Sequence, residues 1–551
     1  MKGWWPFILL FFALDAHAQV GNCETSLAEA YLNAGNVRAR ILTTGSLFWR
    51  GSPHVYEVPK GGGSNAIFSA AIWVGGLIND SLHVAASRYG PWEFWPGPLD
   101  EAGNPPDDCS LYDNIWEIRT EDIQAFLDGG GISTNLENWP WQLGAPVLDG
   151  DGNPDNYNLD GGDLPALLGD QRLWWIMNDR GNAHRSTDSE PLGIEVHASA
   201  FAFDHPSTLG NLTFYEYQVI NKNTAPVKDT YFTLFADVEI GNWADDYIGS
   251  DSLLHLGFAY NADNNDQYNN GYGIAPPAIG FTFLETISAD EDGLDNNRNG
   301  SIDEPDEKLG TTSVMAWHKG AGVAGNPRNA SEYYNNMQAL WNDGRPLIEG
   351  RRGRDGVPPY KKTRFFLPGD PLSGTFWSEI NWDNEGNSHE PYDRKLISTT
   401  GPFVMRPGDT TTVRFAIIWS RGEDHLDSIR VLRKDTRAVR STAEELYSAL
   451  TRDDFTIEQP PPANHVLGFD QNFPNPFSQS TTFRYSLPQP MQVRLAVYDM
   501  LGREVALLVD AQQEAGIYTT EFDAGNLPAG VYLARIELDF LQFTKRMVLL
   551  R

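Results

Sequence analysis

Stretches rich in aromatic and β-branched residues recur between Gln19 and Phe455 and predict β-strands. Such residues suit the pleated, half-buried surface of a sheet, and alternation with polar residues marks a strand with one buried face. The segment 230–241, TYFTLFADVEIG, alternates most regularly. The same composition predicts strands at 66–78, 212–221, 253–261 and 410–420.

One segment of this region has helical spacing instead. Between positions 425 and 450 the apolar residues recur every three or four positions, at Leu426, Ile429, Leu432, Val439, Ala443, Leu446 and Leu450. Acidic residues at its start suit the positive end of a helix dipole. We therefore expect a mainly β protein with one helix near 425–450, built as one or two β-sandwich-like units with long loops. A boundary between two such units near residue 200 is possible.

The C-terminal part of the chain shows shorter alternating strands separated by turns that contain glycine and proline. The alternation is clearest at 481–487, 492–499, 517–523, 530–538 and 543–550. The proline-rich stretch before them, 456–466, predicts a stiff, extended linker. We expect a small immunoglobulin-like β-sandwich at 467–551, joined by this linker to a β-rich passenger region at 19–455.

The segment 1–18 has the pattern of a signal peptide. Lys2 precedes an apolar run from Trp4 to Leu14, and Ala16-His17-Ala18 follows as an A-x-A cleavage site. This run is far shorter than a membrane-spanning helix, which needs about 20 residues. We expect the segment 1–18 to be removed during export, and no later stretch predicts a transmembrane segment.

Charge narrows the classes of partner. The 551 residues include 74 acidic and 41 basic side chains, which gives a net charge of −33 at pH 7. Such a surface repels phosphate backbones, so we expect no nucleic-acid binding. It also disfavours attraction to anionic membranes, whereas the excess of carboxylates suits divalent cations.

Two cysteines, Cys23 and Cys109, are present, and no C-x-x-C motif occurs. A thiolate zinc site is therefore not expected. Export to an oxidising compartment would permit a disulfide between them. Sequence spacing does not establish the geometry of such a bond, so two unpaired thiols remain an equal alternative.

The tail opens with the motif NFPNPF, formed by Asn472, Phe473, Pro474, Asn475, Pro476 and Phe477. The two prolines fix φ and keep the residues before them extended, so the two phenylalanines can anchor a stiff entry segment on the sandwich. Three further blocks follow in order: VYDMLGREVALLVD, AGIYTTEFDAGNLPAGVYLARI and the basic end KRMVLLR.

Together these four blocks resemble the C-terminal sorting domain, type A, of the type IX secretion system of the Bacteroidetes and their relatives. The resemblance covers the segment 467–551. It implies export through the periplasm and the outer membrane by the type IX secretion machinery, and release to the medium or attachment to the cell surface. Phrases of the passenger, such as VRARILTTGSLFW and GDQRLWWIMND, are similar to large secreted proteins that share this tail. That group has no assigned activity, so the similarity implies no reaction.

The clearest chemistry of the passenger is a carboxylate loop at 290–306. Counted from Asp295, the acidic and amide positions match the twelve-residue EF-hand loop, except that an aspartate stands where the last glutamate is usual. We expect a structural Ca²⁺ ion there. The candidate ligands are Asp290, Asp292, Asp295, Asn297, Asn299, Asp303 and Asp306.

Two other acidic sets are weaker candidates. One comprises Asp237, Glu239, Asp245, Asp246, Asp251, Asp263 and Asp266. It could form a second calcium site or the carboxylate pair of a glycosidase, which needs a defined separation that the sequence does not give. The other is the Asp-, Gly- and Asn-rich stretch from Leu148 to Asp163. A solvated loop is the default expectation for it, with an ion as the alternative.

Signals of an enzyme are weak. The chain contains neither a G-x-S-x-G elbow nor an H-E-x-x-H motif, and its 11 histidines are scattered. We therefore expect a secreted, non-catalytic, calcium-stabilised protein with a structural, adhesive or binding role. The alternatives are a secreted polysaccharide hydrolase and a carbohydrate-binding protein with cell-surface glycans as partners.

Overall fold

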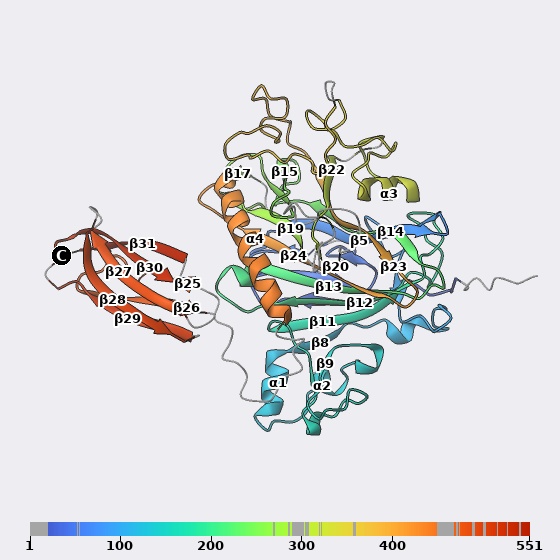
Figure 1. The fold of residues 1–551 in the computed structure, drawn as a ribbon, viewed down its shortest axis with the longest axis horizontal. Helices are drawn as coiled ribbons and strands as arrows, with labels where there is room; N and C mark the ends of the chain where they lie inside the picture. Colours follow the sequence, from blue (N-terminus) through green and yellow to red (C-terminus); the bar gives the residue numbers. More distant parts are fainter. Residues whose placement is uncertain are drawn as a thin grey trace, which may run out of the picture. The chain divides into compact units, whose positions relative to one another are not determined.

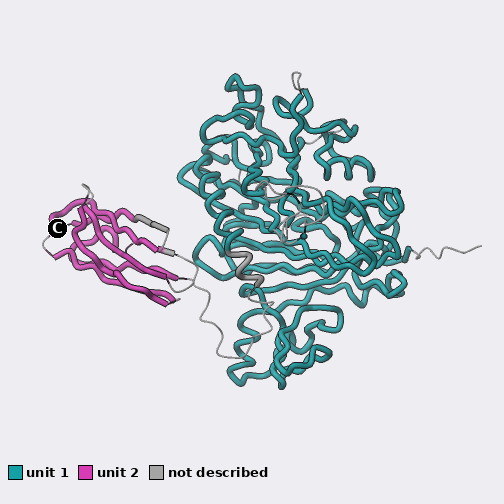
Figure 2. The backbone as a smooth tube through the Cα atoms, viewed as in Figure 1, with its two compact units in different colours: residues 1–451 teal, residues 452–551 magenta. Residues whose placement is uncertain are grey.

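A computed structural model describes residues 20–448 and 468–550, apart from short gaps. The gaps are 52, 54, 268–269, 285–286, 289–301, 303–307, 319, 321, 356–359, 470–471, 473, 488–490, 500–502, 515, 526 and 539–540. The signal peptide, the linker at 456–466 and the predicted EF-hand-like ligands therefore lie outside the described residues. The chain divides into two compact units, residues 1–451 and 452–551 (Figure 2).

The first unit contains two large antiparallel sheets (Figure 1). In spatial order, the first sheet consists of β1 (Glu29–Leu32), β2 (Arg38–Leu42), β3 (Ser46–Leu47), β5 (Ile67–Ile78), β14 (Val227–Val238), β23 (Arg394–Met405) and β22 (Ser313–His318). Strand β4 (Tyr56–Glu57) pairs with β2, and β6 (Ser81–Ala86) pairs with β5.

The second sheet has the same number of strands. Its order is β15 (Asp246–Asp251), β16 (Leu256–Asn261), β19 (Ala278–Leu284), β24 (Thr410–Ser420), β13 (Leu212–Asn221), β12 (Ile194–Ala202), β11 (Gln171–Asn178) and β7 (Trp95–Pro96). Strand β8 (Trp116–Arg119) also pairs with β11. Residue 200, near which a boundary was left open, lies inside β12 between two paired strands, and the chain is not divided there.

Aromatic side chains join the two sheets into a sandwich. The ring of Tyr217 on β13 lies 5.6 Å from that of Phe232 on β14, and Phe232 lies 6.1 Å from Phe283 on β19. All three rings are buried in one continuous apolar cluster. Because each ring removes a large apolar area from water, this layer supplies much of the driving force for folding. The predicted mainly β, sandwich-like fold is confirmed.

Helix α4 (His425–Ser448) covers the outer face of the second sheet. Ile429 and Leu432 are fully buried against residues of that sheet, among them Phe258 and Ile418. The helix predicted near 425–450 is thus confirmed, and its apolar stripe is the face that packs. Three shorter helices accompany it: α1 (Thr120–Leu127), α2 (Thr134–Glu137) and α3 (Ala330–Met337). Within the described residues, none of the helices has the length and hydropathy required to cross a bilayer.

A smaller layer formed by residues 116–168 packs against β11. Trp174 and Ile176 of β11 are buried with Ile118, Leu136 and Trp139. This layer contains the short antiparallel pair β9 (Val147–Leu148) and β10 (Leu164–Pro165). Two more short pairs occur elsewhere: β17 (Asn265–Asp266) with β18 (Gly273–Ile274), and β20 (Ile287–Ser288) with β21 (Lys308–Leu309).

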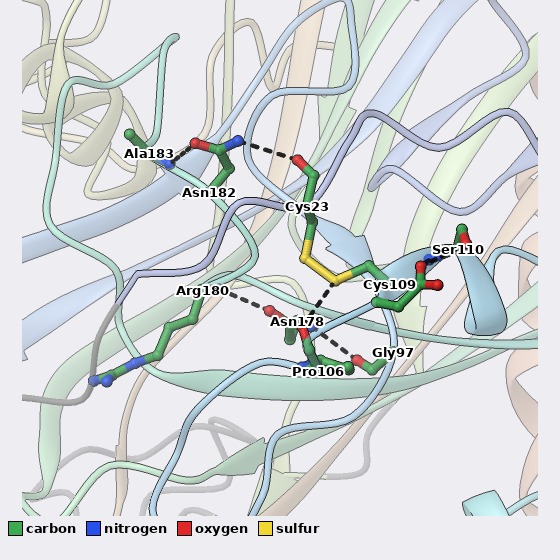
Figure 3. Close-up of a disulfide and its surroundings, with 10 residues drawn as sticks. Cys23, Gly97, Pro106, Cys109, Ser110, Asn178, Arg180, Asn182 and Ala183 are labelled. Carbon is green, nitrogen blue, oxygen red and sulfur yellow. Dashed lines mark hydrogen bonds between the residues drawn. A yellow bond between two sulfur atoms is a disulfide. The ribbon is translucent and has the colours of Figure 1, made fainter.

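The two cysteines form a disulfide (Figure 3). Both are buried beside Trp95, and their Cα atoms are 5.5 Å apart. The chain around Cys23 is also held by its backbone, because Cys23 N donates to Gly181 O at 2.8 Å and Asn182 Nδ2 donates to Cys23 O at 3.1 Å. The sequence left open whether Cys23 and Cys109 are paired or free, and the structure shows them paired.

The second unit is a small two-sheet β domain. One sheet has the order β25 (Gly468–Phe469), β26 (Ser480–Leu487) and β29 (Gly516–Asp523). The other has the order β28 (Glu504–Gln513), β27 (Met491–Asp499), β30 (Gly530–Leu538) and β31 (Leu541–Leu549). The inward residues of both sheets form one apolar cluster of their own, which includes Phe483, Val493 and Ile536.

Candidate metal centre

A carboxylate loop at residues 149–163 is the best-defined candidate for a cation site among the described residues. Asp149 directly follows β9 and Asp163 directly precedes β10. Since Leu148 and Leu164 are paired across these strands, the two aspartates are brought together although they are far apart in the loop. Single carboxylate oxygens of Asp149, Asp151 and Asp163 all lie within 4.8 Å of one another. That spread is compatible with one Ca²⁺ ion, whose oxygen ligands lie about 2.3–2.6 Å from it.

Hydrogen bonds hold Asp163 in place. Its Oδ1 accepts from Gly150 N at 2.9 Å, and its Oδ2 accepts from Asn158 N at 2.6 Å. The side chain is almost fully buried, at 1% exposure. The negative charge of Asp163 adds to burial in raising the pKa of the neighbouring Tyr157. A buried carboxylate held by backbone amides in this way is a fixed, preorganised oxygen donor.

Asp149 and Asp151 are exposed and are oriented by the loop itself. Asp149 Oδ1 accepts from Gly152 N at 2.7 Å, and Asp151 Oδ1 accepts from Asn153 N at 3.0 Å. Asp151 Oδ2 accepts from the side-chain amides of Asn158 at 2.9 Å and Asn156 at 3.1 Å. These hydrogen bonds lower the pKa of Asp151, so its carboxylate is ionised at neutral pH.

Glycine allows the close approach that closes the loop. A Cβ atom at Gly161 would lie 2.8 Å from Asp151 Oδ2, and one at Gly150 would lie 2.3 Å from the backbone of Gly162. Such distances exclude any side chain at these two positions without movement of the loop. Gly150 and Gly161 therefore allow the loop to close so that its carboxylates converge.

No basic partner neutralises the site within the described part of the chain. No lysine, arginine or histidine there forms an ion pair with Asp149, Asp151 or Asp163. A cavity of about 210 Å³ adjoins the loop. Its lining combines polar and apolar side chains: Trp141, Ala145, Val147, Asp149, Asn153, Pro154, Asn156 and Asp163. Asp149 and Asp163 line this cavity, and with Asp151 they form a set of uncompensated carboxylates that fits a hard divalent cation with room for water ligands.

The predicted EF-hand-like ligands from Asp290 to Asp306 lie outside the described residues, so their arrangement stays a prediction. The strands on either side are described, and they form the pair β20–β21, in which Ile287 is opposite Leu309. Two-residue strands, and not helices, therefore flank this loop, as they flank the loop at 149–163. The two acidic loops share this mode of closure.

The second acidic set is not one centre. Asp237 is buried and bound to Lys395, and it accepts a hydrogen bond from Tyr89. Asp251 pairs with Arg433 at 3.2 Å. Asp245, Asp246 and Asp266 instead lie near one another: Asp245 precedes β15, Asp246 is its first residue, and Asp266 is in β17.

The histidines that are close in sequence do not share a centre either. His184 is buried, and its ring nitrogens lie within hydrogen-bonding distance of Val84 O and Asp179 O. His197 pairs with Glu195 at 2.9 Å, whereas His205 pairs with Ser207 at 2.7 Å. Each is satisfied locally, as packed histidines are.

In the C-terminal unit, the NFPNPF segment is fastened to β31. Asn475 Nδ2 donates to Arg546 O at 3.1 Å, and its Oδ1 accepts from Val548 N at 2.9 Å. Phe477 N donates to Val548 O, and the Phe477 ring, buried at 3% exposure, lies 6.1 Å from Phe522.

The first residue of the motif is fixed as well. Asn472 is buried, and its Nδ2 donates to Thr481 Oγ1 at 2.9 Å and to Pro474 O at 3.2 Å. The predicted anchoring role thus falls to Phe477 among the described residues, while Phe473 lies outside them. Pro474 and Pro476 are exposed at the surface of the unit.

Comparison with known proteins identifies this unit. Residues 471–550 match the family model described as the secretion system C-terminal sorting domain. The chain therefore carries a type IX secretion sorting domain, which directs export to the cell surface or the extracellular space. No curated protein matches the chain. Solved structures that resemble it include a polysaccharide lyase, at 9% identity and a TM-score of 0.17. That match covers 73% of this chain and 38% of the lyase, and it is too weak to carry an argument about function.

Proposed function

We propose that the protein is a non-catalytic, calcium-stabilised component of the cell surface or extracellular space. The observation that carries this proposal is the convergence of Asp149, Asp151 and Asp163 in a loop with no basic partner among the described residues. The ion would neutralise their mutual repulsion and hold the loop from Asp149 to Asp163 in one conformation. Millimolar calcium outside cells would fill a site with a Kd of about 10⁻⁴–10⁻³ M at least in part.

The same argument extends by sequence to the loop at 290–306. Its spacing is that of a calcium loop, and the β20–β21 pair closes it as β9–β10 closes the first. We propose that it binds a second structural Ca²⁺ ion through the predicted ligands, Asp295 among them. Both sites would stabilise surface loops, and neither has a role in a reaction.

The proposed calcium sites can be tested by calorimetry on the mature chain, by which we mean residues 19–551 without the predicted signal peptide. Calcium should give heat that is reduced by Asp151→Asn, reduced by Asp295→Asn, and reduced most by the two together. Asp80→Asn is a matched control, because Asp80 lies in an exposed turn at positive φ, which asparagine also adopts. Absence of heat with the unmodified protein would refute the proposal.

Carbohydrate binding is a second candidate, supported by one observation. Trp243 and Tyr392 form an aromatic pair, with ring centroids 5.8 Å apart, and are 39% and 45% exposed. Exposed aromatic faces offer stacking surfaces for sugars. A glycan array with the mature chain tests this role, and a positive signal should be lost with Trp243→Ala.

The polysaccharide hydrolase has less support from the geometry. Of its candidate carboxylates, Asp237 is buried and bound to Lys395, and Asp246 is fully buried, so neither is exposed to a polysaccharide chain. A hydrolysis screen on polysaccharides, with and without calcium, would expose an activity. Turnover abolished by Asp245→Asn would replace our proposal with an enzymatic one.

A further inference from the structure

The turn that leads from β14 into β15 gathers three carboxylates. Asp246 is the first residue of β15 and lies opposite Asn261 of β16, and Asp245 directly precedes the strand. Ile240 N, at the beginning of the turn, donates to Asp246 Oδ2 at 3.2 Å. Asp266 approaches from β17, and its Oδ2 accepts from Tyr272 N at 2.5 Å.

Glycine brings Asp266 against this turn. A Cβ atom at Gly241 would lie 1.9 Å from Asp266 Oδ2, so residue 241 must lack a side chain for the carboxylate to occupy its position. Gly241 also has φ of 70°, which favours glycine. The turn at 240–246 and the hairpin at 265–274 are thus in direct contact through an acidic side chain.

One of these carboxylates is buried with an oxygen that has no partner. Asp246 is fully buried, at 0% exposure, and its Oδ1 forms no hydrogen bond within the described part of the structure. The half-buried Asp245 likewise has an Oδ1 without a partner there. A buried charged oxygen in this condition is strongly destabilising unless something compensates it.

The electrostatic environment shows that compensation by a basic side chain is missing. Burial raises the pKa of Asp246 well above its ordinary value, and the charge of Asp245 raises it further. Burial also raises the pKa of Asp245, to about 6. No lysine or arginine in the described residues forms an ion pair with Asp245 or Asp246.

Other buried carboxylates of this protein are treated differently. Asp237 is bound to Lys395, Glu216 to Arg172 and Arg414, and Glu379 to Arg394. These three acids are neutralised by basic side chains of the chain, whereas no basic side chain of the described residues pairs with Asp246, so a positive partner from outside the chain would compensate it.

We infer that this turn is a divalent-cation site, in which Ca²⁺ binds between Oδ1 of Asp246 and Oδ1 of Asp245 beside the charge of Asp266. Calcium accepts such oxygen donors and tolerates irregular geometry, so backbone and water oxygens can complete its shell. The carboxylates of the three residues do not meet the 4.8 Å spread of the loop at 149–163. We therefore expect weaker binding here, and binding should draw the turn and the hairpin together.

The site is independent of the two loops proposed above and can be tested apart from them. In a full-length mature chain carrying Asp151→Asn and Asp295→Asn, about 5 mM CaCl₂ at pH 8 should still raise Tm by about 2 °C or more relative to EDTA. Adding Asp246→Asn should abolish this residual rise. The neutral amide should also leave the protein at least as stable in EDTA as its parent, because it removes an uncompensated buried charge. Asp80→Asn should leave the residual rise unchanged.

Terbium luminescence gives a second readout that does not depend on the stability of a variant. Trp243, two residues before Asp245, can sensitise Tb³⁺ bound at the turn. In the same double-variant chain, excitation of tryptophan should give terbium emission that calcium displaces and that Trp243→Phe strongly reduces.

Two results would overturn the inference. One is a Tm in the double-variant chain that calcium does not change, with no terbium emission. The other is a residual calcium response of equal size with and without Asp246→Asn. Either result would mean that a proton, and not a metal ion, compensates Asp246. The two proposals can fail separately. If Asp151→Asn and Asp295→Asn do not change the calcium heat but Asp246→Asn removes a calcium response, the proposed loop sites are wrong and the site at the 240–246 turn stands.

Discussion

The disulfide between Cys23 and Cys109 should contribute a large share of the stability of the first unit. We consider its removal by the paired substitution Cys23→Ser and Cys109→Ser. The bond closes a loop with a sequence separation of 86 residues. It also fixes the N-terminal segment, which precedes the first strand, beside Gly181 and Trp95.

The size of the effect follows from the entropy of loop closure. For a loop of this length the chain-entropy relation, 2.1 + 1.5R ln n cal/mol/K, gives about 4.6 kcal/mol at 25 °C. Measured values for disulfides cover about 0–5 kcal/mol, so we take about 2–5 kcal/mol as the expected loss in the free energy of unfolding. The bond needs an oxidising compartment, in agreement with export of the chain.

Urea unfolding of residues 19–551, followed by tryptophan fluorescence, measures this loss. The transition of the first unit should move to lower urea in the double variant, with little change in slope. The unmodified protein in a reductant is the matched control and should shift in the same direction by a similar amount. A loss below about 1 kcal/mol, or a transition insensitive to the reductant, would refute the reasoning.

Three further predictions concern other parts of the molecule. Burial would raise the pKa of Glu379, but the charge of Arg394 and a hydrogen bond with His389 hold it below the ordinary 4.5. Its contribution to stability is therefore present above pH 4.5 and lost as the pH falls through the lower folded-state pKa. Glu379→Gln should flatten the acid limb of a plot of Tm against pH, and an unchanged limb would contradict this role. Asp151→Asn should remove about 1–2 kcal/mol of calcium-dependent stabilisation at about 5 mM calcium, measured as the shift in urea midpoint on adding EDTA; an unaltered shift would contradict the site. Phe477→Ala should destabilise the C-terminal unit by about 3–5 kcal/mol, because Phe477 is buried, and should reduce export. Unfolding of that unit measures the first effect, and the amount of protein in the medium measures the second. Ser478 is exposed, so Ser478→Ala should have neither effect.

Several elements could be predicted from local sequence alone. The strand expected at 212–221 is observed as β13 with the same bounds, and the helix expected near 425–450 is observed as α4. The helix has a 3–4 periodicity because one face packs on the second sheet, whereas β13 is buried on both faces and is recognised by its aromatic and β-branched residues. The sorting domain was also recognisable, because its motif consists of consecutive residues whose packing is local to that domain.

The order of strands and the candidate site could not be derived in this way. Strands β5, β14 and β23 are neighbours in one sheet although long stretches of sequence separate each from the next, and alternation does not encode such partners. Strands β9 and β10 have two residues each, too few for a periodic signal. Because this pair brings Asp149 and Asp163 together, their convergence could be seen only in three dimensions.

The buried ion pairs were hidden for the same reason. Asp237 looked like one of several equivalent acids, but β14 and β23 place it opposite Lys395 in the register of the sheet. Pairing of distant strands thus decides which acids are neutralised within the chain and which stay available for a metal ion.

The central claim is that the C-terminal unit is a self-contained export domain and that the first unit is its cargo. The most direct test joins the segment 452–551 to a monomeric reporter that carries the segment 1–18, and expresses the fusion in a bacterium with a working type IX secretion system. Our account predicts that the reporter reaches the cell surface or the medium, and that Phe477→Ala keeps it in the periplasm. A reporter that stays in the periplasm with the unmodified unit, although the unit is folded, would contradict the account.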